Sequence, residues 1–121
     1  MKPIFLVLAV FFAASASAGE LTPAGRAEVA HLFTHLQQSG CQFNRNGSWY
    51  AAGEAVAHLQ KKFDYLQKKK LVASAEDFIA RAASESSVSG KPYLVKCGAT
   101  AAVPSGAWFR AALEKYRQAA R

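Results

Sequence analysis

Several features that mark special classes of protein are missing from this sequence of 121 residues. It contains neither a collagen-like Gly-x-y period nor a heptad repeat, so a fibre is excluded. Its longest apolar run, residues 4–14, is too short to span the roughly 30 Å hydrocarbon core of a membrane. Charged residues make up 19% and hydrophobic residues 51% of the chain, a balance that argues against intrinsic disorder. The sequence therefore predicts a compact globular domain.

The N-terminal residues have the organisation of a secretory signal peptide. Met1 and Lys2 provide a short basic region, residues 4–14 are apolar, and Ala16, Ser17 and Ala18 form a small-residue cleavage site. The rival interpretation is a retained membrane anchor. We expect residues 1–18 to be removed and residues 19–121 to form one exported domain. No cysteine lies at the end of the apolar region, where a lipoprotein would need one, so lipid attachment is not expected, and no membrane span is expected after cleavage.

Cysteine is scarce, and only Cys41 and Cys97 are present. An exported chain folds in an oxidising compartment, so we expect these two residues to form a disulfide. In the chain-entropy description, closing so long a loop stabilises the fold by about 4 kcal/mol at most. A catalytic pair of thiols is the alternative, but it would more naturally have the close spacing Cys-x-x-Cys.

Apolar residues recur at helical spacing in four segments, and residues that favour helix ends flank these segments. Two further segments, residues 41–45 and 93–97, alternate as strands do, and pairing them would bring the two cysteines together. We therefore expect a mainly α fold of about four helices, with a short two-stranded β-ribbon and one disulfide. The first expected helix begins at Thr22-Pro23 and ends at Gly40, and the second runs from a capping Ser48 to Lys70. The third begins at Ser74, and the fourth begins at Pro104-Ser105.

One edge of the second expected helix carries polar side chains beside its apolar stripe. Glu54 and His58 are four residues apart there, close enough for a carboxylate to orient an imidazole as a general base. With Ser87 they would form the Ser-His-Glu arrangement of a small hydrolase. No Gly-x-Ser-x-Gly sequence supports this hypothesis, and the alternative is that these side chains join the helix to a loop through hydrogen bonds.

Two other segments combine residues suited to ligand recognition. The first contains Arg45, Asn46, Trp49 and Tyr50 within six residues, and it offers a guanidinium for an anion and aromatic rings for a sugar or an aliphatic chain. The second, residues 84–93, is rich in serine and ends at Tyr93. If the two expected strands pair, both segments lie beside Glu54 and His58. Structural turns and caps are the alternative interpretation.

Metal and nucleic-acid chemistry receive little support. His31 and His35 are four residues apart, a spacing at which both rings reach one metal, but two ligands do not make a site. We therefore predict no metal and no cofactor. The chain carries a formal charge of +7, with several lysines near residues 61–70. An exported basic protein meets an anionic envelope component or an envelope protein rather than nucleic acid.

An ordered series of short motifs resembles the YfeK-like family of small exported bacterial proteins, whose domain has no known function. The resemblance implies a periplasmic or secreted protein of a Gram-negative bacterium, and it implies no activity. We expect a non-enzymatic envelope protein that recognises a protein partner or an anionic or sugar-containing ligand; the alternatives are the hydrolase and a purely structural role. The motifs are Cys41-x-Phe43-x-Arg45-Asn46-Gly47-x-x-Tyr50, Ala55-x-x-His58-Leu59-x-x-Lys62, Glu76-x-Phe78-Ile79, Ser86-Ser87-x-Ser89-Gly90-x-Pro92-Tyr93-x-Val95-x-Cys97, Ser105-x-x-Trp108 and Tyr116-Arg117.

Overall fold

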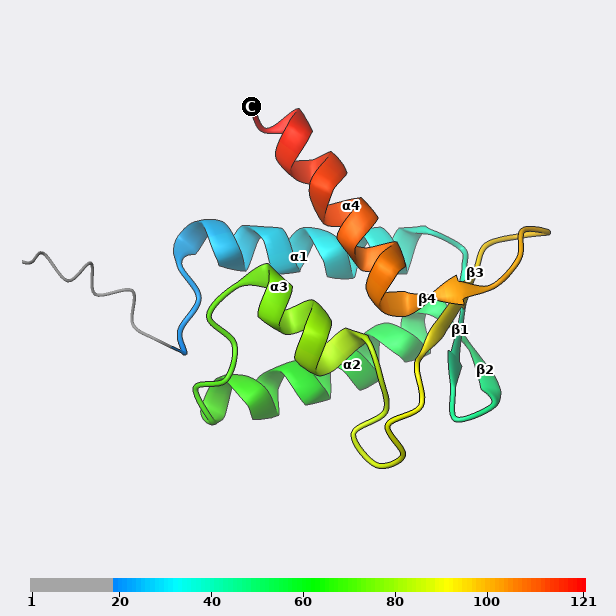
Figure 1. The fold of residues 1–121 in the computed structure, drawn as a ribbon. Coiled ribbons are helices and arrows are strands. Elements are labelled where there is room, and N and C mark those ends of the chain that lie inside the picture. Colours follow the sequence, from blue (N-terminus) through cyan, green and yellow to red (C-terminus); the bar gives the residue numbers. More distant parts are fainter. Residues whose placement is uncertain (1–18) are drawn as a thin grey trace, which may run out of the picture.

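The computed structural model describes residues 19–121, and the predicted signal peptide lies outside this range. Four α-helices carry a small antiparallel sheet at one end (Figure 1). The sheet lies where α1 ends and where α2 and α4 begin. The elements are α1 (Pro23–Gln38), β1 (Gln42–Arg45), β2 (Ser48–Ala51), α2 (Ala52–Lys68), α3 (Ala75–Phe78) continued by a π-helical turn (Ile79–Ala83), β3 (Leu94–Lys96), β4 (Val103–Pro104) and α4 (Ser105–Ala119).

The predicted starts of α1 and α3 are confirmed. The Thr22 hydroxyl accepts a hydrogen bond from the backbone N–H of Gly25 at 3.0 Å, and Pro23 occupies the first helical turn. At α3, the Ser74 hydroxyl accepts from the backbone N–H of Asp77 at 3.0 Å. The Asp77 carboxylate in turn accepts from the backbone N–H of Ala73 at 2.9 Å. These bonds satisfy donors that a helix leaves unpaired at its N-terminus.

The predicted start of α2 is wrong. Ser48 begins strand β2, and α2 starts after Ala51, which makes no side-chain capping bond. Asn46 and Gly47 both have positive φ, 51° and 85°, the arrangement of a two-residue type I′ turn. That turn folds the chain into a β1–β2 hairpin, so Ser48 pairs with Arg45 rather than capping a helix.

The sheet has the strand order β2-β1-β3-β4, and all its pairs are antiparallel. The predicted pairing of residues 41–45 with 93–97 is confirmed, since Phe43 lies opposite Val95. The observed sheet is wider than the predicted two-stranded ribbon, because β2 and β4 add one strand on either side. Cys41 and Cys97 form the predicted disulfide, with Cα atoms 4.3 Å apart.

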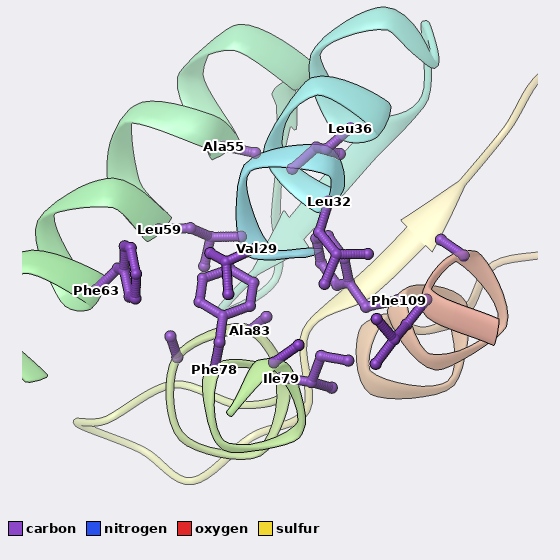
Figure 2. Close-up of a cluster of buried hydrophobic side chains, with 14 of the residues drawn as sticks. Val29, Leu32, Leu36, Ala55, Leu59, Phe63, Phe78, Ile79, Ala83 and Phe109 are labelled. Carbon is purple, nitrogen blue, oxygen red and sulfur yellow. The ribbon is translucent and has the colours of Figure 1, made fainter. Parts of the chain in front are cut away.

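One hydrophobic core joins the helices to the inner face of the sheet (Figure 2). The ring of Phe78 lies at its centre and packs edge-on against the rings of Phe63, with centroids 5.4 Å apart, and Phe109, with centroids 6.1 Å apart. Leu32 and Leu59 bring α1 and α2 into the same cluster, and both are fully buried. Along the part of the chain from residue 19 onward, no helix is long and apolar enough to cross a membrane.

Candidate functional site: a basic cleft beside α2

A cleft of about 340 Å³ opens at the sheet end of the molecule. Its walls are the β1–β2 turn, the middle of α2 and the loop that leads into β3. The cleft brings together five of the eight residues that the sequence proposed for ligand binding: Arg45, Asn46, His58, Ser87 and Tyr93. We call this site the basic cleft.

Asn46 fastens the hairpin turn to the serine-rich loop. Its side-chain amide donates to the hydroxyl of Ser86 at 3.3 Å, and its amide oxygen accepts from the hydroxyl of Ser89 at 2.6 Å. Ser86 is buried, and its hydroxyl also accepts from the backbone N–H groups of Val88 and Ser89, both at 3.3 Å. Two walls of the basic cleft, 40 residues apart in the sequence, are therefore held together.

Tyr93 is the hydrogen-bonding centre of the cleft floor. Its hydroxyl lies 3.0 Å from the Lys62 ammonium and 3.1 Å from Nε2 of His58. An ammonium group has donors only, so the phenol oxygen accepts from Lys62. The second hydrogen bond of the hydroxyl is shared with Nε2 of His58, and its direction is set by the tautomer of the imidazole. Lys62 also donates to the backbone carbonyl of Glu85 at 2.8 Å. His58 and Lys62 reach Tyr93 together because a spacing of four residues places them on one face of α2.

The three groups are perturbed mainly by burial, which disfavours their charged forms. Burial, with smaller repulsion from Arg45, Lys62 and Lys61, lowers the pKa of His58 to about 4. Burial also lowers the pKa of Lys62 to about 8; the charge of Glu85 opposes this shift and that of Arg45 adds to it. The pKa of the Tyr93 phenol is raised by burial, against a smaller opposite effect of Arg45. At neutral pH the cleft therefore holds a neutral imidazole, a neutral phenol and a charged amine.

Arg45 is the second cation of the basic cleft. Its guanidinium lies over the ring of Tyr50, 4.6 Å from the ring centroid. In residues 19–121, neither Arg45 nor Lys62 has a carboxylate partner. Arg45 is also a source of positive charge felt by His58, Lys62 and Tyr93. The cleft thus concentrates positive charge that this part of the protein leaves uncompensated.

The remaining predicted residues lie elsewhere or serve differently. Trp49 pairs with Asn44 on the face of the sheet opposite Phe43, because side chains alternate along a strand, and it does not line the cleft. Tyr50 supports Arg45 from the inner face. Glu54 is exposed and makes no hydrogen bond or salt bridge to His58, which has Tyr93 as its partner.

The arrangement of a Ser-His-Glu hydrolase is not formed among the described residues. Ser87 lines the same cleft as His58, but no hydrogen bond joins the two side chains. His58 also lacks a carboxylate to orient it, and a base with a pKa of about 4 is poorly matched to proton abstraction near neutral pH.

His31 and His35 pack against aromatic rings of α4. His31 stacks on Tyr116 with centroids 4.4 Å apart, and His35 stacks on Trp108 at 4.8 Å. Among residues 19–121, no group of three or more metal-ligating side chains gathers around them or anywhere else.

A larger cleft of about 440 Å³ lies near the start of the described chain. Its charged side chains are of both signs, and two of them, Glu20 and Lys70, form a salt bridge across it. The basic cleft is smaller but has unpaired charge of one sign, which makes it the better candidate for binding a ligand.

The sequence did not predict that Lys62 has a central role in the cleft or that the hydroxyl of Ser86 is buried there. The signal for Lys62 was present, since it follows His58 at the spacing i, i+4, but its partner Tyr93 is 31 residues away. The role of Ser86 depends on how the 84–93 loop folds back, with its backbone N–H donating to the carbonyl of Lys91 at 2.9 Å. No local sequence pattern predicts that hydrogen bond.

Comparison with known proteins places the chain in a family. It is 42% identical over 64 residues to the Salmonella typhimurium protein named uncharacterized protein YfeK. This alignment covers 53% of the chain and 52% of the relative, so the chain spans about half the length of the relative that it matches. No solved structure matches the chain. A family model covers residues 23–117, which include every element of the fold except the last two residues of α4, and the chain therefore belongs to the family of unknown function DUF5329, as the YfeK-like motifs predicted.

Proposed function

We propose that this protein is an exported, non-enzymatic envelope protein that binds an anionic ligand in the basic cleft. The observation that carries the proposal is the presence of Arg45 and Lys62 in one cleft, without a carboxylate partner for either among residues 19–121. Uncompensated like charges repel each other, so an anion that enters the cleft relieves a cost already present in the free protein.

The state of Arg45 supports this assignment. Its guanidinium lies over the ring of Tyr50, a contact that restricts the movement of the side chain, and its N–H groups remain able to form paired hydrogen bonds with a carboxylate or a phosphate. The contacts of Asn46 with Ser86 and Ser89 hold the turn that carries Arg45. A site fixed before the ligand arrives loses less conformational freedom on binding.

Export is the second element of the proposal. A disulfide between Cys41 and Cys97 is compatible with an oxidising compartment outside the cytoplasm. N-terminal sequencing of the protein recovered from the periplasm tests export directly, and we expect a mature chain that begins at Gly19. An unprocessed chain confined to the cytoplasm would overturn this element.

The binding element is tested by nuclear magnetic resonance with glucuronate and glucose 6-phosphate as anionic probes and glucose as the neutral control. We expect both anions to shift the amide signals of Arg45, Asn46 and Tyr93, and glucose not to shift them. The double variant Arg45→Gln/Lys62→Gln should abolish these shifts. Lys61→Gln, which removes one exposed charge next to the cleft, is the matched control and should retain them.

Two results would sink the binding proposal. One is the absence of shifts with either anion. The other is shifts that persist undiminished in the Arg45→Gln/Lys62→Gln protein. Turnover of a p-nitrophenyl ester that is lost in Ser87→Ala would instead support the alternative of a hydrolase.

A further inference from the structure

The two cations of the basic cleft come from different elements and point to a ligand group with more than one negative charge. Arg45 lies at the end of β1 and Lys62 in the third turn of α2, and both line the cleft. No acidic side chain lines it. The carboxylate of Glu85 acts on Lys62 from an exposed residue outside the lining, and its effect on the pKa of Lys62 is weaker than that of burial.

The hydrogen-bonding capacity of the two cations is unequal. Lys62 uses two of its three N–H donors on the hydroxyl of Tyr93 and the carbonyl of Glu85, which leaves one donor for a ligand. Arg45 lies over the ring of Tyr50, and its five N–H donors form no hydrogen bond to residues 19–121. Together they offer one flat, two-pronged donor and one point charge.

We propose that the basic cleft binds a terminal phosphate monoester, with Arg45 donating a pair of hydrogen bonds to two phosphate oxygens and Lys62 donating to the third. This inference rests on the proposed function and assigns the chemical class of its ligand. No covalent step is involved.

Charge selects this class among the common anions. A phosphate monoester carries between −1.5 and −2 charges at pH 7 and has three strong acceptor oxygens, whereas a carboxylate, a sulfate ester and a phosphodiester each carry one negative charge. Arg45 and Lys62 together supply two positive charges. The imidazole of His58 is neutral at pH 7 and adds no third charge, because burial lowers its pKa to about 4. The dianion is therefore the best electrostatic match.

The size of the cleft limits the ligand. A volume of about 340 Å³ is at the lower end of the range of roughly 300–1,000 Å³ for small-molecule sites. It suits a phosphate with a group about as large as one sugar ring, and not an extended polymer. The hydroxyl of Ser87 and the exposed side chain of Val88, both on the cleft wall, are then available to the group attached to the phosphate. Such a phosphate is found both in soluble sugar phosphates and in lipid headgroups.

Isothermal titration calorimetry with two ligands of nearly identical shape tests the charge requirement. Glucose 6-phosphate and glucose 6-sulfate differ by about one negative charge at pH 7. We expect the full mature chain to bind the phosphate at least about tenfold more tightly than the sulfate or glucuronate. Arg45→Lys, which keeps the charge but removes the paired donors, should weaken phosphate binding about tenfold, and Lys61→Gln should leave it within about twofold.

The pH dependence gives a second readout that does not rely on a variant. The second ionisation of a phosphate monoester has a pKa of about 6, so affinity for glucose 6-phosphate should rise severalfold between pH 5.2 and pH 7.0. Affinity for glucose 6-sulfate, which does not ionise in this range, should stay flat. His58 titrates at about 4 and remains neutral across the interval.

The source of the phosphate is resolved with vesicles. Flotation with vesicles that contain phosphatidic acid, a monoester, is compared with vesicles that contain phosphatidylglycerol, a diester. Selective capture by phosphatidic acid together with weak binding of glucose 6-phosphate assigns a lipid headgroup. The reverse result assigns a soluble phosphate, and either outcome supports the phosphate monoester.

Two failures are distinguishable. If glucose 6-sulfate or glucuronate binds as tightly as glucose 6-phosphate, and binding needs Arg45 and Lys62, the phosphate assignment is overturned while the anion-binding function stands. If no anion binds, or if binding does not depend on these two residues, both are overturned.

Discussion

Arg45 and Arg117 are the same kind of side chain in two different situations. Arg117, near the end of α4 and far from the sheet (Figure 1), donates from Nε and Nη2 to the two carboxylate oxygens of Glu28 at 2.7 and 3.1 Å. It also donates to Glu76 at 2.7 Å, so one guanidinium joins α1, α3 and α4. Arg45, at the sheet end, has an aromatic ring beneath it and no carboxylate among the described residues.

The difference shows how charge can be divided between stability and binding. Where both partners of an ion pair come from the protein, the donors are already occupied and the pKa of the arginine is raised by those hydrogen bonds. Where the protein supplies only the cation, the donors stay available. At the end that holds Arg117, the positive charge is paired with carboxylates of the protein. At the end that holds Arg45, the positive charge is left without a salt-bridge partner among the described residues.

The sheet end should depend most on its covalent link. Reduction of Cys41–Cys97, or the double change Cys41→Ser/Cys97→Ser, opens the covalent loop that joins two residues 56 positions apart. Either change should lower the free energy of unfolding by about 4 kcal/mol at most. Urea denaturation of the oxidised and reduced proteins measures the loss. Thiol titration of the native oxidised protein should find no reactive cysteine, and two titratable thiols would contradict the structure.

Disrupting the floor of the basic cleft should have the next largest effect. His58→Ala removes one of the two hydrogen-bond partners of the Tyr93 hydroxyl and leaves a gap in the half-buried site, so we expect a loss of about 1–3 kcal/mol in unfolding free energy. Glu54→Ala, at an exposed residue, should change stability by less than about 0.5 kcal/mol. Chemical denaturation of both variants makes the comparison. An equal loss of stability in both variants would indicate that Glu54 and His58 interact, and would contradict the structure.

Removal of Arg117 should mainly lower stability, and removal of Arg45 should mainly abolish binding. Arg117→Ala leaves the partly buried carboxylate of Glu28 without its bidentate partner and should cost about 1–2 kcal/mol of stability, with no change in phosphate binding. Arg45→Ala should cost less than about 1 kcal/mol, the scale of an exposed cation–π contact, and abolish binding. Thermal unfolding and calorimetry on both proteins test this prediction, which fails if Arg45→Ala is the more destabilising change.

Acid should affect the two ends in separate pH ranges. The folded pKa of His58, about 4, lies below the usual 6.5, so the unfolded chain binds a proton that the folded chain does not. Stability therefore falls as pH drops from 6.5 to 4, by about 1 kcal/mol once solvent screening of a half-exposed group is included. The pKa of Glu76 is lowered by Arg117, so its contribution is lost only below pH 4.5. His58→Gln should reduce the first loss in a series of melting curves, to which His35 also contributes because burial lowers its pKa, and Arg117→Ala should reduce the second.

Local sequence patterns predicted much of the fold but only part of the site. The helical spacing of Leu32 and Leu36, or of Leu59 and Phe63, is set by burial of one helix face and can be read without the structure. The hairpin was missed because Ser48 suits a helix cap and a strand start alike, and only pairing with β1 decides between them. Trp49 was included in the site because it stands four residues after Arg45, and only the hairpin register shows that it lies on the other face of the sheet.

Contacts between distant segments were the least predictable. Arg117 and Glu28 are 89 residues apart, and no spacing rule connects them. The resemblance to the YfeK-like family identified the segments around the basic cleft, but it did not say that Lys62 would reach Tyr93. Such contacts depend on the completed packing of α2 against the loop before β3.

The disulfide has a topological consequence for the basic cleft. Cys41 and Cys97 enclose all of its lining residues, from Arg45 to Tyr93, within one covalent ring, while α1 and α4 lie outside that ring. The serine-rich loop is an exposed part of this ring, with Val88 at 96% exposure. A protease that cuts the chain there opens the ring without releasing a fragment, since both halves stay attached through the sulfur atoms. A single cut at Val88, which lines the basic cleft, would therefore nick one wall of the cleft while the disulfide keeps the residues on either side of the cut in one covalent molecule.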